Sequence, residues 1–286
     1  MRSVKFLIAA GAASMLSTTA FAADMPSIMP PPPAYAPAPP PCCDTGGWYL
    51  RGDIGMTNEK VDNLTLTSAP FPAGFNTTGL GFDSSTLYDI GVGYQFNNWF
   101  RADVTGQWRG KANLHGSQYS VLGASFPGFA ANDNYSGSYS SAVVMLNGYV
   151  DLGTWWCVTP FVGAGVGAAY NRISGFRDDG VIYNGGVLSN SATFAGDAGK
   201  WDLAWAVHAG LAYHVTNNLT VELAYSYMNL GSAVTGLTNS FDGVTVVNQS
   251  GFTLKDITSN DIKLGVRWNF DQPPPPAPMM PLIRKG

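Results

Sequence analysis

The chain alternates apolar and polar residues over several segments of about ten residues, and the last segment shows the pattern most clearly. Over residues 261–270 the even-numbered positions, from Ile262 to Phe270, are all apolar. The odd-numbered positions include the charged residues Asp261, Lys263 and Arg267. In a β-strand, successive side chains point to opposite faces of the sheet. The segment is therefore predicted to be a strand with one apolar face and one face that carries charge.

Eight segments of this kind are predicted to be strands. Six alternate clearly: 48–56, 88–96, 100–109, 202–213, 219–227 and 261–270. The other two are less regular, because Val143 and Met145 break the polarity of 141–151 and because 160–170 is rich in glycine. Each segment runs for about 9–12 residues, close to the 9–11 that a tilted membrane-spanning strand needs.

The connections between these segments alternate between short and long. Tight turns are predicted at Asn97–Asn98, Gly153–Thr154 and Thr216–Asn218, whereas 57–85, 110–138, 172–200 and 231–258 are long and rich in Ser, Asn, Gly and Asp. Short turns on one side and long loops on the other are typical of outer-membrane barrels. The fold predicted is all-β: an eight-stranded antiparallel up-and-down transmembrane β-barrel with short periplasmic turns and long extracellular loops.

Aromatic residues are predicted to form two bands on the outside of this barrel. The band at the turn end would hold Trp48, Tyr94, Phe96, Trp99, Phe100, Trp155, Trp156, Tyr213, Trp268 and Phe270. The band at the loop end would hold Trp108, Tyr139, Tyr170, Trp201, Trp205, Tyr225 and Tyr227. Two such bands match the interfacial girdles of a spanning barrel. The alternative is a soluble barrel, whose interior would be lined by Trp and Leu.

The two ends of the chain differ from the barrel in composition. Residues 1–22 have the charged, apolar and small-residue regions of a signal peptide that ends at Ala22, and the apolar run is too short to span a bilayer. Residues 23–45 and 271–286 are rich in proline and are predicted to be a periplasmic linker and a periplasmic tail around a barrel of residues 46–270.

Charge and cysteine content narrow the class further. Loss of Arg2 and Lys5 with the signal peptide would change the formal charge from −4 to −6, and no basic tract predicts nucleic-acid binding. Charged residues make up only 12% of the chain, which suits a surface that faces lipid. A disulfide between Cys157 and Cys42 or Cys43 stays open, although the odd number of cysteines argues against a disulfide framework.

Three segments carry a resemblance to a known family: 47–55 (GWYLRGDIG), 160–167 (PFVGAGVG) and 262–270 (IKLGVRWNF). With them, residues 46–270 resemble the small porin-like outer-membrane proteins of alphaproteobacteria, which belong with the OmpA/OmpX-type eight-stranded barrels. The resemblance implies a cell outer-membrane location in contact with lipid, and Trp268 and Phe270 as the signal read by the barrel-assembly machinery. Here Asp271–Gly286 follow that signal, whereas Phe is the last residue in most relatives. The resemblance also implies that His115 could bind haem at the surface.

The lumen-facing charges are the main candidates for function. They are five cations and four carboxylates: Arg51, Asp53, Asp89, Arg101, Asp103, Arg109, Glu222, Lys263 and Arg267. Buried charges persist when they are paired, so we expect an internal salt-bridge network in a structural protein that contributes to envelope integrity. A narrow channel for small hydrophilic solutes or ions is the alternative reading of the same residues.

The long loops support a third class of function. Their exposed Phe, Tyr and Leu residues suit a surface adhesin that makes host-surface contacts. No enzymatic activity, cofactor or metal site is predicted. The glycine-rich run Gly163–Ala168 matches a dinucleotide fingerprint in letters only, because it lies within a strand and no helix follows it.

Overall fold

The computed structural model describes residues 47–71, 74–121, 128–241 and 246–270. The predicted signal peptide, the Pro-rich linker and tail, Cys42 and Cys43 lie outside the described residues. Within the described part, no helix is long and apolar enough to cross a membrane.

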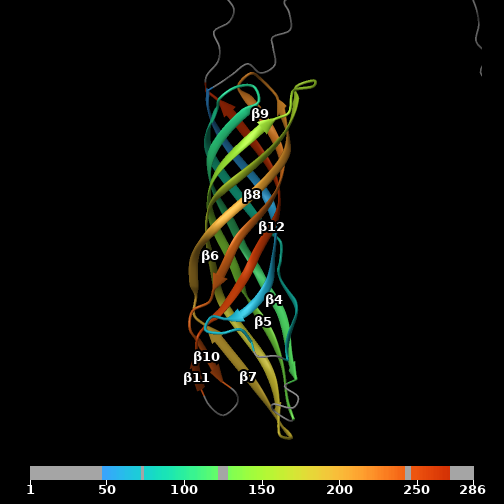
Figure 1. Cartoon of the computed structure of the whole chain (residues 1–286), viewed down its shortest axis with the longest axis vertical. Coiled ribbons are helices and arrows are strands. Elements are labelled where there is room, and N and C mark those ends of the chain that lie inside the picture. The colour runs from blue at the N-terminus through green and yellow to red at the C-terminus, as the bar shows by residue number, and fades with distance from the viewer. Residues whose placement is uncertain (1–46, 72–73, 122–127, 242–245, 271–286) are drawn as a thin grey trace, which may run out of the picture. The chain divides into compact units, whose positions relative to one another are not determined.

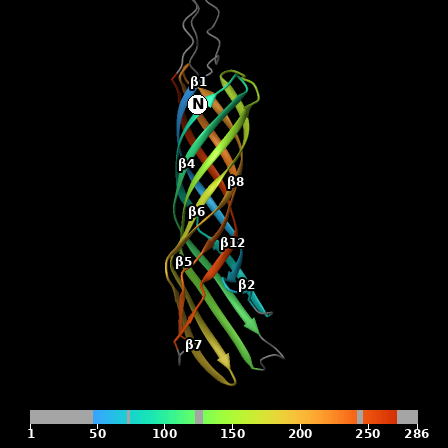
Figure 2. The same cartoon turned by 60° about the vertical axis from the view of Figure 1, so that its left-hand side comes forward.

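The described residues form one antiparallel sheet that closes on itself (Figures 1 and 2). Its strands are β1 (Gly47–Leu66), β2 (Phe75–Phe82), β3 (Ser85–Gln95), β4 (Phe100–Val121), β5 (Phe129–Asp151), β6 (Val158–Asn184), β7 (Val187–Ala195), β8 (Ala198–His214), β9 (Leu219–Val234), β10 (Thr238–Phe241), β11 (Val246–Gln249) and β12 (Phe252–Asn269). The ring runs β1–β3–β4–β5–β6–β8–β9–β12 and closes where β12 pairs with β1. The predicted eight-stranded up-and-down barrel is therefore confirmed.

The three tight turns and both ends of the barrel segment lie together, at what we term the turn end (top of Figure 1). Phe270 N donates to Trp48 O at 3.0 Å, which joins the last strand to the first. The side chain of Asn97 organises the β3–β4 turn, because its Oδ1 accepts from Trp99 N at 3.0 Å and from Phe100 N at 2.7 Å. This use of an Asn side chain to satisfy turn amides explains why the chain reverses there.

The predicted long loops are mostly strands, so their assignment as loops was wrong. β4, β5 and β6 continue well past the predicted boundaries and reach 22, 23 and 27 residues. β2, β7, β10 and β11 also lie within the predicted loops, and β10 and β11 extend the sheet beyond β7 at the end opposite the turns, which we term the far end (bottom of Figure 1). Strand pairing satisfies the backbone polar groups of these Ser- and Asn-rich segments.

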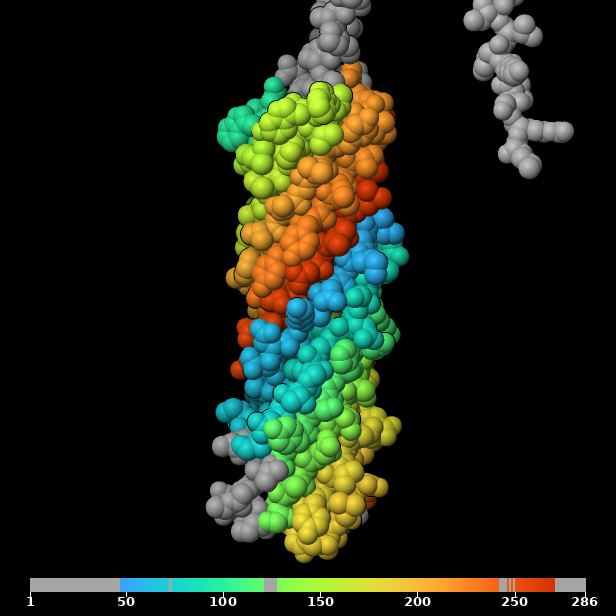
Figure 3. All heavy atoms as spheres, turned by 90° about the vertical axis from the view of Figure 1, so that its right-hand side faces the viewer, coloured from blue at the N-terminus to red at the C-terminus, as the bar shows by residue number. Residues whose placement is uncertain are grey.

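The outer face of the ring is apolar between the two ends. In β12, Ile262 and Leu264 are 62% and 54% exposed. Lys263, which lies between them, is 4% exposed, and Arg267, on the same face as Lys263, is 2% exposed. The soluble alternative, with Trp and Leu in the interior, is therefore wrong. Figure 3 shows the strands as oblique bands of side chains around the barrel wall.

One member of the predicted aromatic bands lies inside the barrel instead. Tyr139 is fully buried, its ring centroid lies 4.6 Å from that of Phe82, and its hydroxyl donates to Asn171 Oδ1 at 2.8 Å. The adjacent inward positions Val143 and Met145, which break the alternation, are also buried. The inside of β5 is thus apolar where the prediction required it to be polar.

The interior accordingly has two parts. Charged side chains fill it toward the turn end, and an apolar core fills it toward the far end. The core members are Val61, Leu64, Phe82, Ala112, Leu114, Tyr135, Tyr139, Val143, Met145, Ala169, Ile173, Phe176, Ala204, Ala206, Met228, Leu230, Ala233, Phe252, Leu254 and Ile257. Small residues in β6 make room for this packing, since a Cβ on Gly167 would collide with the carbonyl oxygen of Val144.

Candidate functional site

Seven charged side chains from five strands meet inside the barrel near the turn end, and we term them the Glu222 cluster. They are Arg51, Asp53, Arg101, Asp103, Asp151, Glu222 and Arg267. Each points inward because the period-two alternation of its strand puts the apolar neighbours on the lipid side. All seven are at most 7% exposed.

Glu222 of β9 is the centre of this cluster. Its carboxylate lies 3.2 Å from Arg101 Nη1, 3.3 Å from Arg267 Nε and 3.6 Å from Arg51 Nη2. Neither of its oxygens makes a hydrogen bond of good geometry with a described residue. Glu222 therefore acts on the three guanidinium groups through its charge, which offsets their mutual repulsion.

The other contacts of the three arginines hold them in place. Arg51 donates to Asp53 Oδ2 at 2.8 Å and to Asp103 Oδ2 at 3.2 Å. The Arg101 guanidinium lies 4.5 Å from the ring centroid of Tyr149 and 4.7 Å from that of Phe161, and its Nε donates to Asp151 Oδ1 at 3.3 Å. Ring faces attract a desolvated cation, so these aromatic groups stabilise a buried arginine without adding charge.

The second group is centred on Arg109 of β4, and we term it the Arg109 cluster. Arg109 is fully buried and forms ion pairs with Asp261 and, at 3.4 Å, with Glu59 Oε1. Its Nη1 also donates to Thr57 Oγ1 and Ser259 Oγ at 2.8 Å, and its Nη2 to Gln107 Oε1 at 2.8 Å. This arginine links strands β1, β4 and β12 across the interior.

The remaining two predicted charges form a separate pair. Lys263 Nζ of β12 lies 3.5 Å from Asp89 Oδ2 of β3, and both side chains are buried. The structure therefore brings all nine predicted lumen charges into the interior, in three groups rather than one.

The predicted set of lumen charges left out three acids that complete these groups. Glu59 and Asp261 neutralise Arg109, and Asp151 contacts Arg101. Glu59 and Asp261 lie in the same odd-numbered register as Arg51 and Lys263, and that register was the available signal. Glu59 was missed because the first strand was ended at Met56.

The three histidines lie in three separate environments. His115 of β4 is exposed, and its Nδ1 lies 3.6 Å from Asp83 Oδ1. His208 is buried between Ser226 Oγ, at 2.8 Å from Nδ1, and Asn147 Oδ1, at 3.2 Å from Nε2. His214 lies at the turn end beside Thr159 and Thr220. No group of three or more His, Cys, Asp or Glu side chains suited to a metal ion occurs among the described residues.

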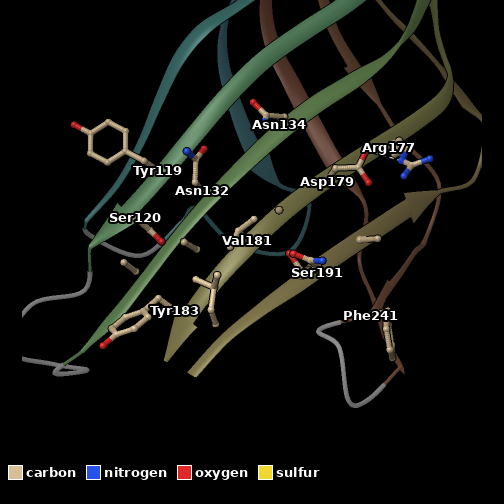
Figure 4. Close-up of a pocket in the computed structure, with 16 residues that line it drawn as sticks. Tyr119, Ser120, Asn132, Asn134, Arg177, Asp179, Val181, Tyr183, Ser191 and Phe241 are labelled. Carbon is tan, nitrogen blue, oxygen red and sulfur yellow. Dashed lines mark ion pairs between the residues drawn. The ribbon is translucent and has the colours of Figure 1, made fainter. Parts of the chain in front are cut away.

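A second candidate site lies on the outer face of the sheet at the far end, and we term it the far-end groove (Figure 4). It has a volume of about 910 Å³ and is formed by β4, β5, β6, β7 and β10. Its lining residues include Tyr119, Ser120, Asn132, Asn134, Arg177, Asp179, Val181, Tyr183, Leu188, Asn190 and Phe241. Aromatic and aliphatic side chains thus alternate with amides and one ion pair, Arg177 Nε to Asp179 Oδ2 at 2.6 Å.

The two predicted assembly-signal residues lie on the outer face of the barrel. Trp268 and Phe270 at the turn end are 48% and 54% exposed. Their aromatic rings point away from the interior charges, so they play no part in the Glu222 cluster.

Comparisons with known proteins agree with this architecture. Residues 8–270 match the family described as "Outer membrane protein beta-barrel domain". A protein of Rickettsia bellii named "Putative adhesin" is 31% identical over 211 residues, which cover 70% of this chain and 79% of that protein. An uncharacterised protein of Brucella abortus (strain 2308) is 31% identical over 197 residues, or 64% of this chain and 68% of that protein.

Among solved structures, the outer membrane protein OprG from Pseudomonas aeruginosa is 15% identical, with a TM-score of 0.47 over 79% of this chain and 98% of that chain. The family match spans all the described strands of the barrel and its interior charge groups. This chain therefore belongs to the family of outer-membrane β-barrel proteins.

Proposed function

We propose that this protein is a structural, non-conducting outer-membrane barrel that contributes to envelope integrity and presents a contact surface at its far end. The observation that supports the structural role is the packing of the interior. Arg101, Arg109 and Asp261 are fully buried, and Glu222 is 1% exposed. An eight-stranded barrel has room inside for side chains rather than a wide channel, and here ion pairs and the apolar core occupy that room.

A planar-bilayer recording with pure refolded protein tests this role against the channel alternative. We expect no discrete conductance steps from the wild type, because ions would have to cross the Glu222 cluster, the Arg109 cluster and the apolar core in turn. Reproducible single-channel steps that change in size in Glu222→Gln would overturn the proposal in favour of a narrow conduit. A strain that lacks this protein should in addition leak periplasmic proteins, and expression of the wild-type protein in that strain should stop the leak.

A specific observation supports the second part of the proposal, an adhesin-type contact with a protein on an opposing surface. Along β6 the far-end groove begins at Arg177 and ends at Tyr183, about 23 Å and about 43 Å beyond Tyr170 of the loop-end aromatic band at the rise of a strand. Tyr119, Tyr183 and Leu188 are nevertheless 48%, 41% and 69% exposed there. Apolar patches on a water-facing surface mark interaction sites, and Tyr and Arg are frequent in protein interfaces.

Adhesion of cells that display the protein tests this contact. We expect Tyr183→Ser combined with Leu188→Ser to lower adhesion to host cells about tenfold, and protease treatment of the host cells to have the same effect. Leu237→Ser is the matched control, because Leu237 is 76% exposed near the same end but does not line the groove. Undiminished adhesion of the double variant at equal surface abundance would count against the contact.

The proposal requires the far end to lie outside the cell and the turn end to face the periplasm. Labelling of intact cells with a membrane-impermeant maleimide distinguishes the two orientations. Leu237→Cys should be labelled above the wild-type background and Asn217→Cys, at the turn end, should not. The reverse result would contradict the orientation.

A further inference from the structure

The inner face of the far-end sheet encloses a cavity that the proposed contact surface does not use. This mouth cavity has a volume of about 350 Å³, which is within the range of small-molecule sites. Its aromatic lining comes from four segments of the chain, with Phe71 just after β1, Phe75 in β2, Phe129 and Tyr135 in β5, and Phe252 in β12.

The aromatic rings of the mouth cavity contact one another and form a firm wall. The rings of Phe71 and Phe75 are stacked with centroids 5.5 Å apart, and Phe252 lies 6.0 Å from Tyr135 and 6.3 Å from Phe71. The Tyr135 hydroxyl donates to Gln118 Oε1 at 2.8 Å, and Gln118 is 2% exposed. The wall is therefore preformed, which lowers the cost of ordering it around a ligand.

Two carboxyl groups line the same cavity. Asp133 of β5 and Asp178 of β6 both point to the inner face, where Asp178 lies opposite Tyr135 in the strand register. Asp178 Oδ1 is buried and has no hydrogen-bond partner among the described residues. The Asp133 carboxylate lies over Gly180, where a Cβ would collide with its Oδ1.

No cation of the described part of the chain pairs with these two acids. The nearest cation in sequence, Arg177, is on the outer face, where its Nε contacts Asp179 and its guanidinium lies 5.1 Å from the ring centroid of Phe194. Burial, and then the charge of Asp133, raises the pKa of Asp178 to about 7. Burial also raises the pKa of Asp133. The cavity is thus an aromatic pocket with two partly buried acids and no paired cation among the described residues.

We propose that the mouth cavity binds an amphipathic organic cation, with its ammonium group against Asp133 and Asp178 and its apolar body against the Phe71–Phe252 wall. An ammonium donates charge-assisted hydrogen bonds to carboxylate oxygens, including the unpartnered Asp178 Oδ1. The aromatic faces attract the same cation and also bury the hydrocarbon body. A neutral analogue would keep the burial of its hydrocarbon body and lose the hydrogen bonds between ammonium and carboxylate. The two acids would repel an anionic analogue.

Calorimetric titration of the full chain in nanodiscs of zwitterionic lipid tests this proposal with three matched probes. The probes are 4-phenylbutylamine, 4-phenylbutanol and 4-phenylbutyrate, and empty nanodiscs are the blank. We expect the amine to bind about tenfold or more tightly than the alcohol, and the butyrate to bind most weakly. In Asp133→Asn/Asp178→Asn, the amine should fall to the affinity of the alcohol.

Asp197→Asn is the control, because it removes an exposed carboxyl that pairs with Arg172 and does not line the cavity. Its amine affinity should match that of the wild type. The proposal is overturned if the amine does not bind, if the alcohol binds as tightly as the amine to the wild type, or if the Asp133/Asp178 variant keeps the preference. The comparison of amine and alcohol affinities for the wild-type protein tests the proposal even where the Asp133/Asp178 variant fails to fold.

Discussion

The substitution Glu222→Gln tests whether charge pairing holds the interior together. Glu222 lies within 3.6 Å of nitrogens of Arg51, Arg101 and Arg267 and makes no hydrogen bond of good geometry within the part of the chain that the structure describes. Glutamine has nearly the same shape, so this change removes the charge and leaves no cavity. Arg267 then loses the one ion pair that joins it to a described residue, whereas Arg101 keeps Asp151 at 3.3 Å.

The size of the effect follows from these distances. At 3.3 Å and an effective dielectric constant near 20, one ion pair has a Coulomb energy of about 5 kcal/mol. The cost of desolvating the Glu222 carboxylate, which glutamine largely avoids, offsets part of the Coulomb energy summed over its three ion pairs. Removing one member of a buried pair typically costs about 3–5 kcal/mol, because the other charge stays buried. We expect Glu222→Gln to lower the free energy of unfolding by about that amount.

Urea unfolding in phospholipid vesicles, followed by tryptophan fluorescence, measures this change. Asp197→Asn is the control, because the Arg172–Asp197 pair at 3.2 Å is about half exposed and should contribute less than about 1 kcal/mol. Adding Arg267→Met to Glu222→Gln should recover part of the loss, since the uncompensated cation is then gone. A change within 1 kcal/mol for Glu222→Gln, or strict additivity in the double variant, would refute the reasoning.

Three further outcomes are expected. Gly167→Ala should cost about 2 kcal/mol or more in vesicle unfolding because its Cβ meets backbone, whereas Gly106→Ala, with open space around it, should stay within about 0.5 kcal/mol; equal costs would contradict this. Tyr139→Phe should cost about 1–2 kcal/mol by the same measurement, since it leaves a buried hydrogen-bond acceptor unpaired; no loss would contradict it. The raised pKa of Asp178, about 7, means that the folded far end favours the protonated acid, so its stability falls as pH rises from about 4 through 7. The charges of Asp133 and Asp179 add to this destabilisation of ionised Asp178. Asp178→Asn should therefore reduce the loss of stability with rising pH. Far-end amides of the variant should exchange hydrogen more slowly than those of the wild type at pH 8 and at the same rate at pH 4.

The membrane-facing part of the fold could be predicted because lipid imposes a strict pattern. Residues such as Ile262 and Leu264 must be apolar to face hydrocarbon, and the positions between them must then face inward. This rule located all eight ring strands and the inward direction of Arg51, Lys263 and Arg267. It could not show which acid contacts which base, because those pairings depend on the register between strands that are far apart in sequence.

The strand extensions could not be predicted by the same rule because the pattern changes once a strand leaves the lipid. In β1, Asn58, Lys60 and Asp62 face outward, whereas Val61 and Leu64 lie inside the barrel. Polar residues on the outer face made this part of β1 look like a loop. The far-end groove and the mouth cavity were missed for the same reason, since both are built on extensions that were assigned as loops.

The polarity of the strands therefore changes in two steps along the barrel, and irregular pairing occurs farther out, in the extensions. Near the turn end the inner face is charged and the outer face is apolar. At Val143, which is buried, and Val144, which is exposed, both faces are apolar. Farther toward the far end the inner face is apolar and the outer face polar, since Phe176 is buried and Arg177 is exposed. Register shifts occur in this outer region, between Ser136 and Ser138 in the β5–β6 pairing and between Leu254 and Ile257 in the β12–β9 pairing. A bulge moves subsequent side chains to the other face and increases local twist. Odd-numbered side chains such as Ile173 and Ile257 therefore face inward before these shifts, and even-numbered ones such as Phe176 and Leu254 face inward after them. An extension built in this way keeps its shape through its own apolar core and does not need lipid around it, which is what a rigid surface beyond the membrane requires.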